Sequence, residues 1–236
     1  MKINLYPTFE EVFTDETLKG IFYPLCSLTL EKYPDKVFHF ISSNGLWMDE
    51  NYETKFNTFN YTLFDVVENK YKFNGNVKLY KGFKQAKNIF EKLQEDFKTN
   101  GKIYLETKTK TDDYIETQKR NLKIKTDDEF DADYYIQTFY EFSINKLNFE
   151  LTNEFGTFRG VIDGWPDGDK ISPTVYDETT NELKGTLNHY DKPKIENIDT
   201  FEVIGKIVGF EFFTDGNDTV LFHNNSDKIL CVNSYS

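Results

Sequence analysis

The sequence predicts an α+β fold with antiparallel β-sheets, two main helices and a C-terminal β meander. Two segments favour helices, one because its apolar residues recur every three to four positions and one because an acid-rich run begins it. From residue 148 onward, short apolar or alternating runs are separated by turn residues, which is typical of an antiparallel meander. With 236 residues, of which 38% are hydrophobic, the chain can bury a core without disulfides or metal ions.

We expect a single globular domain spanning residues 1–236. A change in charge and pattern at about residue 126 marks two candidate subdomains within it. Residues 1–126 are expected to hold mixed hairpins and a helix, and residues 127–236 an acidic helix followed by antiparallel sheet. The sequence shows no fixed repeat and no low-complexity linker between the two parts.

The first expected element is a short helix that begins after Thr8. Thr8 and Glu11 have the spacing of a capping box, in which each side chain accepts a hydrogen bond from the backbone N–H of the other residue. Glycine and proline interrupt the segment that follows, so residues 21–33 fit either a helix or a strand.

An Asn-Gly pair predicts the first hairpin. Both central positions of a type I′ turn require positive φ, which Asn and Gly tolerate best. Asn44 and Gly45 follow an alternating run, so we expect a hairpin over about residues 36–50. In that register His39 would face Glu50 across the pair of strands.

A second Asn-Gly pair predicts another hairpin further along the chain. Asn74 and Gly75 lie between two short alternating runs, residues 71–73 and 77–80. The residues between the two hairpins alternate in polarity around Tyr61, as a strand would.

The long amphipathic helix is predicted over about residues 83–99. Gly101 is expected to end it as the C′ residue. Residues 102–107 are then interpreted as a strand, and the polar, lysine-rich residues 108–125 as a loop or edge hairpin.

A second main helix is predicted over about residues 127–146. Thr126 and Glu129 have capping-box spacing, and acidic residues in a first turn stabilise the helix dipole. The meander follows, and its surest strands are the three apolar runs after residue 200.

The negative charge of the protein belongs to its second half. Residues 1–126 contain 20 Lys or Arg and 18 Asp or Glu, whereas residues 127–236 contain 8 and 22. A field of this sign attracts basic partners or cations and repels phosphate backbones. A basic protein is therefore the expected partner, and nucleic acid is disfavoured.

The densest polar group surrounds Trp165, next to Asp163, Asp167 and Asp169. Such oxygen-rich loops hold Ca²⁺ or Mg²⁺ in some proteins, but here Thr174 occupies the position where an EF-hand requires Glu. Asp, Gly and Pro are also standard turn residues, so we favour a turn over a metal site and expect no cofactor. Because interface hot spots are enriched in Trp, these four residues are the candidate binding set for the partner, although we favour a buried anchor under the loop as the role of the Trp165 ring.

An alternative function is a metal-dependent hydrolase or nuclease that uses Asp163, Glu182 and Lys184. An acid followed by Glu-x-Lys on adjacent strands matches the arrangement in which carboxylates hold Mg²⁺ and lysine positions water. So short a motif occurs by chance in a chain with 40 acidic residues, and the acidic half of the protein is a poor surface for binding phosphates.

Other chemistry-bearing residues are dispersed. Cys26 and Cys231 are separated by nearly the whole chain and have no CxxC pattern, so we interpret them as buried and unbridged. His39 is interpreted as a partly buried residue of its strand rather than a ligand. No phosphate-binding loop, nucleophile elbow or zinc motif is present in the sequence.

We therefore expect a non-enzymatic, cytoplasmic protein that binds another macromolecule through its acidic C-terminal half. An inhibitor or immunity-type protein that neutralises a basic toxin or nuclease fits this description. No run of apolar residues is long enough to span a membrane, and Glu10 and Glu11 lie where a signal peptide requires an apolar core, so no membrane role is expected.

Overall fold

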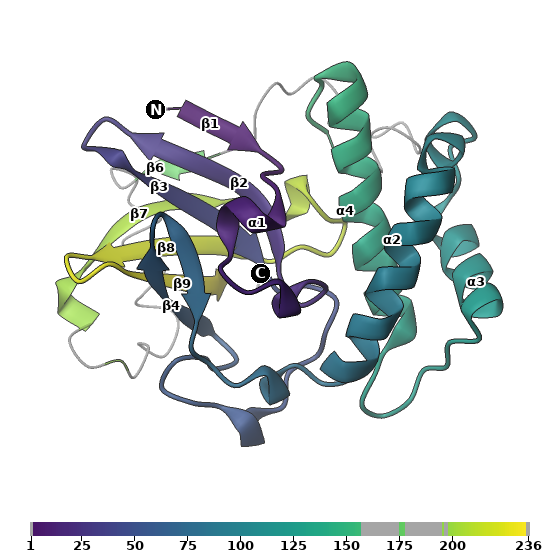
Figure 1. Ribbon diagram of the computed structural model, residues 1–236, viewed down its shortest axis with the longest axis horizontal. Helices are drawn as coiled ribbons and strands as arrows, with labels where there is room; N and C mark the ends of the chain where they lie inside the picture. The colour runs from purple at the N-terminus through teal and green to yellow at the C-terminus, as the bar shows by residue number, and fades with distance from the viewer. Residues whose placement is uncertain (1, 157–174, 178–194, 196–197, 235–236) are drawn as a thin grey trace.

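The computed structural model describes residues 2–156, 175–177, 195 and 198–234. Two antiparallel β-sheets lie beside a group of three long helices (Figure 1). The C-terminal strands form a meander, so the predicted α+β class is confirmed. No helix within the described ranges is both long enough and apolar enough to cross a membrane.

The smaller sheet has the strand order β1-β2-β3. Its strands are β1 (Lys2–Leu5), β2 (Tyr23–Leu30) and β3 (Tyr33–Ser42). β2 and β3 form a hairpin whose turn lies between Leu30 and Tyr33, and this register places His39 opposite Ser27. Residues 21–33, for which the sequence allowed either a helix or a strand, thus contain strand β2.

The predicted hairpin over residues 36–50 is wrong, because β3 pairs with the strand before it. Gly45 does have a positive φ of 96°, but Asn44 has not, so no type I′ turn forms there. Instead, the Asn44 side chain donates a hydrogen bond to the backbone carbonyl of Asp215, 2.6 Å away. This Asn-Gly pair therefore makes a long-range contact, and His39 lies opposite Ser27 rather than Glu50.

The larger sheet has the order β5-β4-β9-β8-β7-β6. β7, β8 and β9 are the predicted meander. β4 and β5 come from the first half of the chain, and β4 joins them to the meander by pairing with β9. Its strands are β4 (Tyr61–Val67), β5 (Lys70–Phe73), β6 (Val175–Asp177), β7 (Phe201–Ile207), β8 (Asp218–Asn224) and β9 (Lys228–Ser234).

The second predicted hairpin is also displaced. The tight turn lies between β4 and β5, where Glu68 and Asn69 both have positive φ, 51° and 63°. Residues 77–79 form a 3₁₀ helix rather than a strand. The buried Asn57 side chain bonds both the N–H and the carbonyl of Asn76, which fixes this loop by a contact between distant segments.

The described residues form four α-helices: α1 (Phe9–Val12), α2 (Phe83–Glu106), α3 (Thr111–Leu122) and α4 (Ala132–Thr152). The capping box at α1 is confirmed. The Thr8 hydroxyl accepts a hydrogen bond from the N–H of Glu11, and the Glu11 carboxylate accepts one from the N–H of Thr8.

α2 continues through Gly101, so the predicted stop and the predicted strand over residues 102–107 are wrong. Gly101 is buried, and a Cβ there would lie 2.8 Å from the ring of Phe97. The glycine therefore makes room for a ring rather than ending the helix. Beyond it, the Tyr104 hydroxyl donates to Asp96, 2.9 Å away, and ties the last turns together.

α3 occupies the segment predicted as a loop or edge hairpin. Tyr114, Ile115 and Gln118 have helical spacing and are buried, and the Gln118 amide donates to Asp96 of α2. The abundant lysines obscured this short apolar stripe in the sequence.

α4 begins later than predicted. Asp131, rather than Thr126, is the N-cap, and its carboxylate accepts a hydrogen bond from the N–H of Tyr134. The carboxylate of Asp127 accepts hydrogen bonds from the backbone N–H groups of Glu129 and Phe130, and these bonds form a turn before the helix.

The main core includes aromatic and aliphatic residues from both sheets and all four helices. Cys26 and Cys231 are buried and unbridged, as expected. Hydrogen bonds from two buried side chains connect the sheets: the Tyr71 hydroxyl of β5 bonds both the N–H and the carbonyl of His39, and the Thr219 hydroxyl of β8 donates to the carbonyl of Ile41. These contacts fix the strand that carries His39.

Candidate functional site

The sequence-predicted site residues are not among those the structure describes. Asp163, Trp165, Asp167, Asp169, Glu182 and Lys184 all lie outside the described ranges. The binding turn and the metal-dependent alternative therefore stay predictions. In the described part of the chain, no three His, Cys, Asp or Glu side chains gather into a group that could hold a metal ion.

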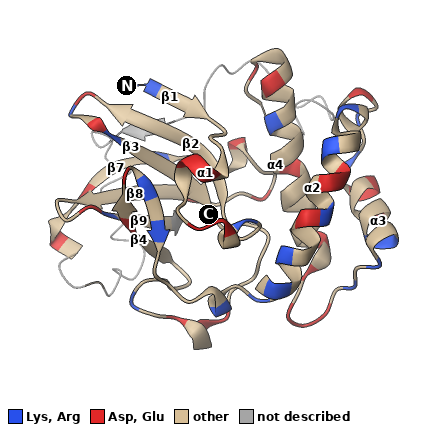
Figure 2. Cartoon of the chain, viewed as in Figure 1, with Lys and Arg blue, Asp and Glu red and all other residues tan. Residues whose placement is uncertain are grey.

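The acidic residues of the second half are partly neutralised by lysines of the first half. Lys32 bonds Glu202 at 2.9 Å, Lys119 bonds Asp133 at 2.6 Å, and Lys36 pairs with Asp227. Figure 2 shows Asp and Glu interspersed with Lys and Arg along α2, α3 and α4. The charge excess is thus not spread over one continuous surface, and the acidic segment before α4 is the clearest concentration that the described residues show.

An exposed tryptophan lies beside that segment. The side chain of Trp47 is 56% exposed, and its ring centroid is 5.1 Å from that of Tyr134. The indole N–H of Trp47 donates to the carboxylate of Asp131, 3.1 Å away. Two contacts therefore hold a large apolar ring in a fixed position at the surface.

Acidic side chains influence the tyrosine that packs against Trp47. Burial raises the pKa of Tyr134, a hydrogen bond with the backbone of Gly45 lowers it, and the charges of Asp215, Glu141 and Asp131 raise it further. Asp128 and Glu129 precede Asp131 and are exposed. We call this surface the Trp47 face, which consists of Trp47, Asp128, Glu129, Asp131, Tyr134 and Asp215.

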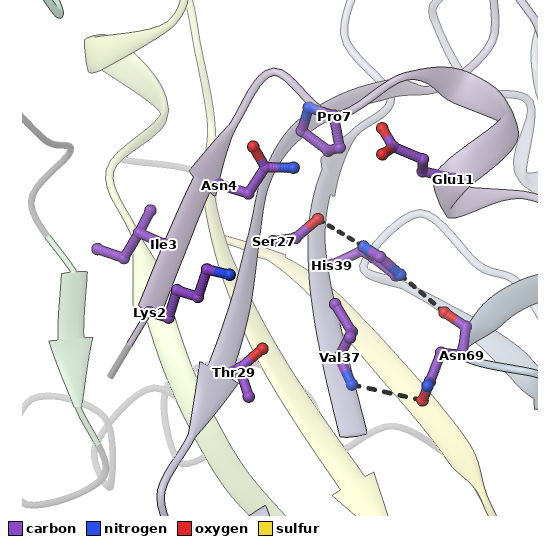
Figure 3. A pocket seen from close by; sticks show the side chains of 10 residues that line it. All are labelled: Lys2, Ile3, Asn4, Pro7, Glu11, Ser27, Thr29, Val37, His39 and Asn69. Carbon is purple, nitrogen blue, oxygen red and sulfur yellow. Dashed lines mark hydrogen bonds between the residues drawn. The ribbon is translucent and has the colours of Figure 1, made fainter. Parts of the chain in front are cut away.

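A separate pocket of about 420 Å³ lies over the polar face of the smaller sheet. Asn4, Ser27 and His39 are directly opposite one another on β1, β2 and β3, so their side chains form one row. Figure 3 shows this row with Lys2 and Thr29, the next pair along the strands, on the same side of the sheet. The alternate residues point into the core.

Ser27 and His39 form a buried hydrogen-bonded pair. The Ser27 Oγ lies 2.7 Å from His39 Nδ1, and His39 Nε2 lies 2.7 Å from the carbonyl oxygen of Asn69 (Figure 3). A carbonyl oxygen only accepts, so Nε2 carries the hydrogen. In the neutral ring, Nδ1 is then the acceptor, and the Ser27 hydroxyl donates to it.

Several groups around the ring determine its charge. Burial lowers the pKa of His39, while the Asn69 carbonyl and the charge of Glu11 act in the opposite direction. The net lowering keeps the imidazole neutral at physiological pH, which is the state of a base. We call this site, with Lys2, Asn4, Glu11, Ser27, Thr29, His39 and Asn69, the Ser27 pocket.

A wider groove of about 850 Å³ separates α1 and β2 from α2 and α4. Phenylalanine rings line it, and two of its lysines pair with acids of its own rim, Lys19 with Glu10 and Lys146 with Glu150. The groove offers apolar contact area, whereas the Ser27 pocket brings hydrogen-bonding groups together.

Sequence reasoning missed both surfaces. Trp47 fell within the predicted hairpin over residues 36–50. The Ser27 pocket can be recognised only once the pairing register of β2 and β3 is known. Comparisons of the chain with protein-family models, with curated proteins and with solved structures find no match.

Proposed function

We propose that this protein is a cytoplasmic binding protein that recognises a basic macromolecule through the Trp47 face. An inhibitor or immunity-type protein that neutralises a basic toxin or nuclease is the role we favour. The observation that carries the proposal is the exposed Trp47 ring, held by Asp131 and Tyr134 beside an acidic segment.

The fixed position of the Trp47 ring favours binding. An indole already held by two contacts loses little conformational freedom on binding, and Trp is enriched among residues that dominate interface energies. The surrounding carboxylates favour a cationic partner, mainly by faster association and by rejecting acidic competitors. Trp165 with Asp163, Asp167 and Asp169 remains the sequence-predicted candidate for further contacts.

The test uses a fluorescein-labelled 20-residue oligolysine as a defined cationic probe, followed by fluorescence anisotropy. We expect binding at low salt that weakens as ionic strength rises, because screening shortens the reach of exposed charges. Trp47→Ala should weaken binding about 30-fold, the effect of losing a hot spot of about 2 kcal/mol.

Matched controls lie at the far end of α4. Leu151 is 54% exposed, close to the value for Trp47, and lies about 30 Å along the helix from Asp131. Leu151→Ala and the charge control Glu154→Gln should leave the affinity unchanged, whereas Asp131→Asn should reduce it. Equal affinities for Trp47→Ala and Leu151→Ala would overturn the assignment of this face.

A further inference from the structure

We propose that Ser27 is a nucleophile, activated by His39, that accepts an acyl group from a small carboxylic ester bearing an anionic group. This activity goes beyond the proposed binding function and uses a different surface. The proposal rests on the Ser27–His39–Asn69 geometry in the lining of the Ser27 pocket.

The first element is the pairing of a nucleophile with an oriented base. Activated serines lie within hydrogen-bond reach of a base that a third group holds in place. Here the Oγ to Nδ1 distance is 2.7 Å, and the Asn69 carbonyl fixes the ring through Nε2. The arrangement differs from the common serine triad, in which Nε2 contacts the serine, but the roles of the atoms are equivalent.

The base is also held rigidly from its backbone. The Tyr71 hydroxyl accepts a hydrogen bond from the N–H of His39 and donates one to its carbonyl, at 2.8 and 2.9 Å. The Tyr71 ring lies edge-on to the imidazole, with centroids 5.1 Å apart. His39 is thus fixed by contacts on β2, β5 and the turn before β5.

The second element is a set of donors beside the nucleophile. Asn4 is opposite Ser27 on β1, and Lys2 is opposite Thr29. Figure 3 shows the Asn4 amide and the Lys2 ammonium on the side of the sheet that carries the Ser27 hydroxyl. An amide N–H suits the oxyanion of an acyl-transfer intermediate, and the ammonium suits a carboxylate on the substrate.

The reaction has two balanced steps. As the Ser27 oxygen bonds to the carbonyl carbon, its proton moves to His39 Nδ1, and the alcohol leaves with that proton when the ester C–O bond breaks. Water then attacks the acyl-serine, gives a proton to Nδ1, and releases the carboxylic acid as the proton returns to Ser27. No oxidant, reductant or metal ion enters either step.

The charged and titratable groups that face His39 are Lys2 on β1, Glu11 on α1 and Tyr71 on β5. Burial raises the pKa of Tyr71 well above its usual value, so its hydroxyl stays neutral. The charge of Glu11 favours the imidazolium that forms as Ser27 reacts. The rate should therefore increase with pH through a value below that of an ordinary histidine.

The experiment treats the full chain with a fluorophosphonate, whose phosphorus forms a bond to the serine oxygen as fluoride leaves. Intact-mass and peptide analysis should find one adduct, on Ser27. Ser27→Ala should abolish it, and His39→Asn should slow labelling at least about 100-fold, the usual contribution of a general base. Ser143→Ala, in the separate groove, serves as the control and should label normally.

Two variants of the exposed β1 strand test the substrate class without altering the buried pair. Lys2→Ala should raise KM for p-nitrophenyl succinate but not for p-nitrophenyl acetate, and Asn4→Ala should lower kcat for both. A folded wild-type protein that gains no adduct on Ser27, or labelling at an equal rate in His39→Asn, would overturn the nucleophile. Equal KM changes for the two esters would overturn the anionic substrate.

Discussion

Replacing Tyr71 by Phe tests how the two sheets are joined. Tyr71 is buried on β5, and its hydroxyl occupies a position between the N–H and the carbonyl of His39 on β3. His39 pairs with Ser27 on its other side. A single hydroxyl therefore provides both hydrogen bonds for the backbone of one residue at the free edge of the smaller sheet.

The magnitude follows from the groups that lose a partner. Tyr71→Phe keeps the ring and its packing against Phe13 and Phe64, so no cavity term arises. It leaves one buried N–H and one buried carbonyl unpaired, each at a cost of about 1–3 kcal/mol. We expect the free energy of unfolding to fall by about 3 kcal/mol in total, and the melting temperature to fall by about 6–12 °C for a chain of this size.

Urea denaturation followed by circular dichroism measures the change, together with differential scanning calorimetry. Tyr33→Phe is the matched control, because the Tyr33 hydroxyl bonds the exposed carboxylate of Glu202 at the surface. That variant should change the free energy by less than about 0.5 kcal/mol. If Tyr71→Phe is as stable as Tyr33→Phe, the hydroxyl does not join the sheets in the way described.

Three further predictions concern stability. Burial lowers the pKa of both His39 and His223, so the unfolded chain binds protons that the folded chain does not. The stability that these histidines contribute should be complete above about pH 6.5 and should decrease as the pH falls through that value. Urea midpoints at pH 7.5 and 5.5 measure this change, and a midpoint that rises on acidification would contradict it. Gly101→Ala should destabilise the protein despite the helix propensity of Ala, because the new Cβ would lie 2.8 Å from the Phe97 ring, and a higher melting temperature would refute the packing role. Asp131→Ala should cost about 1 kcal/mol of unfolding free energy through loss of the α4 cap, whereas Asp131→Ser should restore most of it, as thermal denaturation of the pair will show.

The sequence itself determined the features that depend on neighbouring residues. The capping box at Thr8, the apolar stripe that begins α2 and the three strands of the C-terminal meander all follow from patterns a few residues long. Such patterns act through local hydrogen bonds and through the period of the apolar face, which the same short segment contains in full. The fold class follows from their sum.

The tertiary structure decided how these segments pair and where they end. Asn44 and Asn74 do not form turns of the predicted kind, since their side chains bond Asp215 and Asp65 instead. Gly101 does not stop α2, because it accommodates a neighbouring ring. In each case a side-chain hydrogen bond or a packing contact outweighed the local conformational preference of the residue, which is about 1 kcal/mol.

The Ser27 pocket shows the same division. The alternation around His39 indicated its strand, but its partner depends on which neighbouring strand pairs with it. The third member of the arrangement, the Asn69 group, is a backbone carbonyl, and a carbonyl is present at every position of the chain. Side-chain type alone therefore does not mark it, and only the folded register brings it to the imidazole.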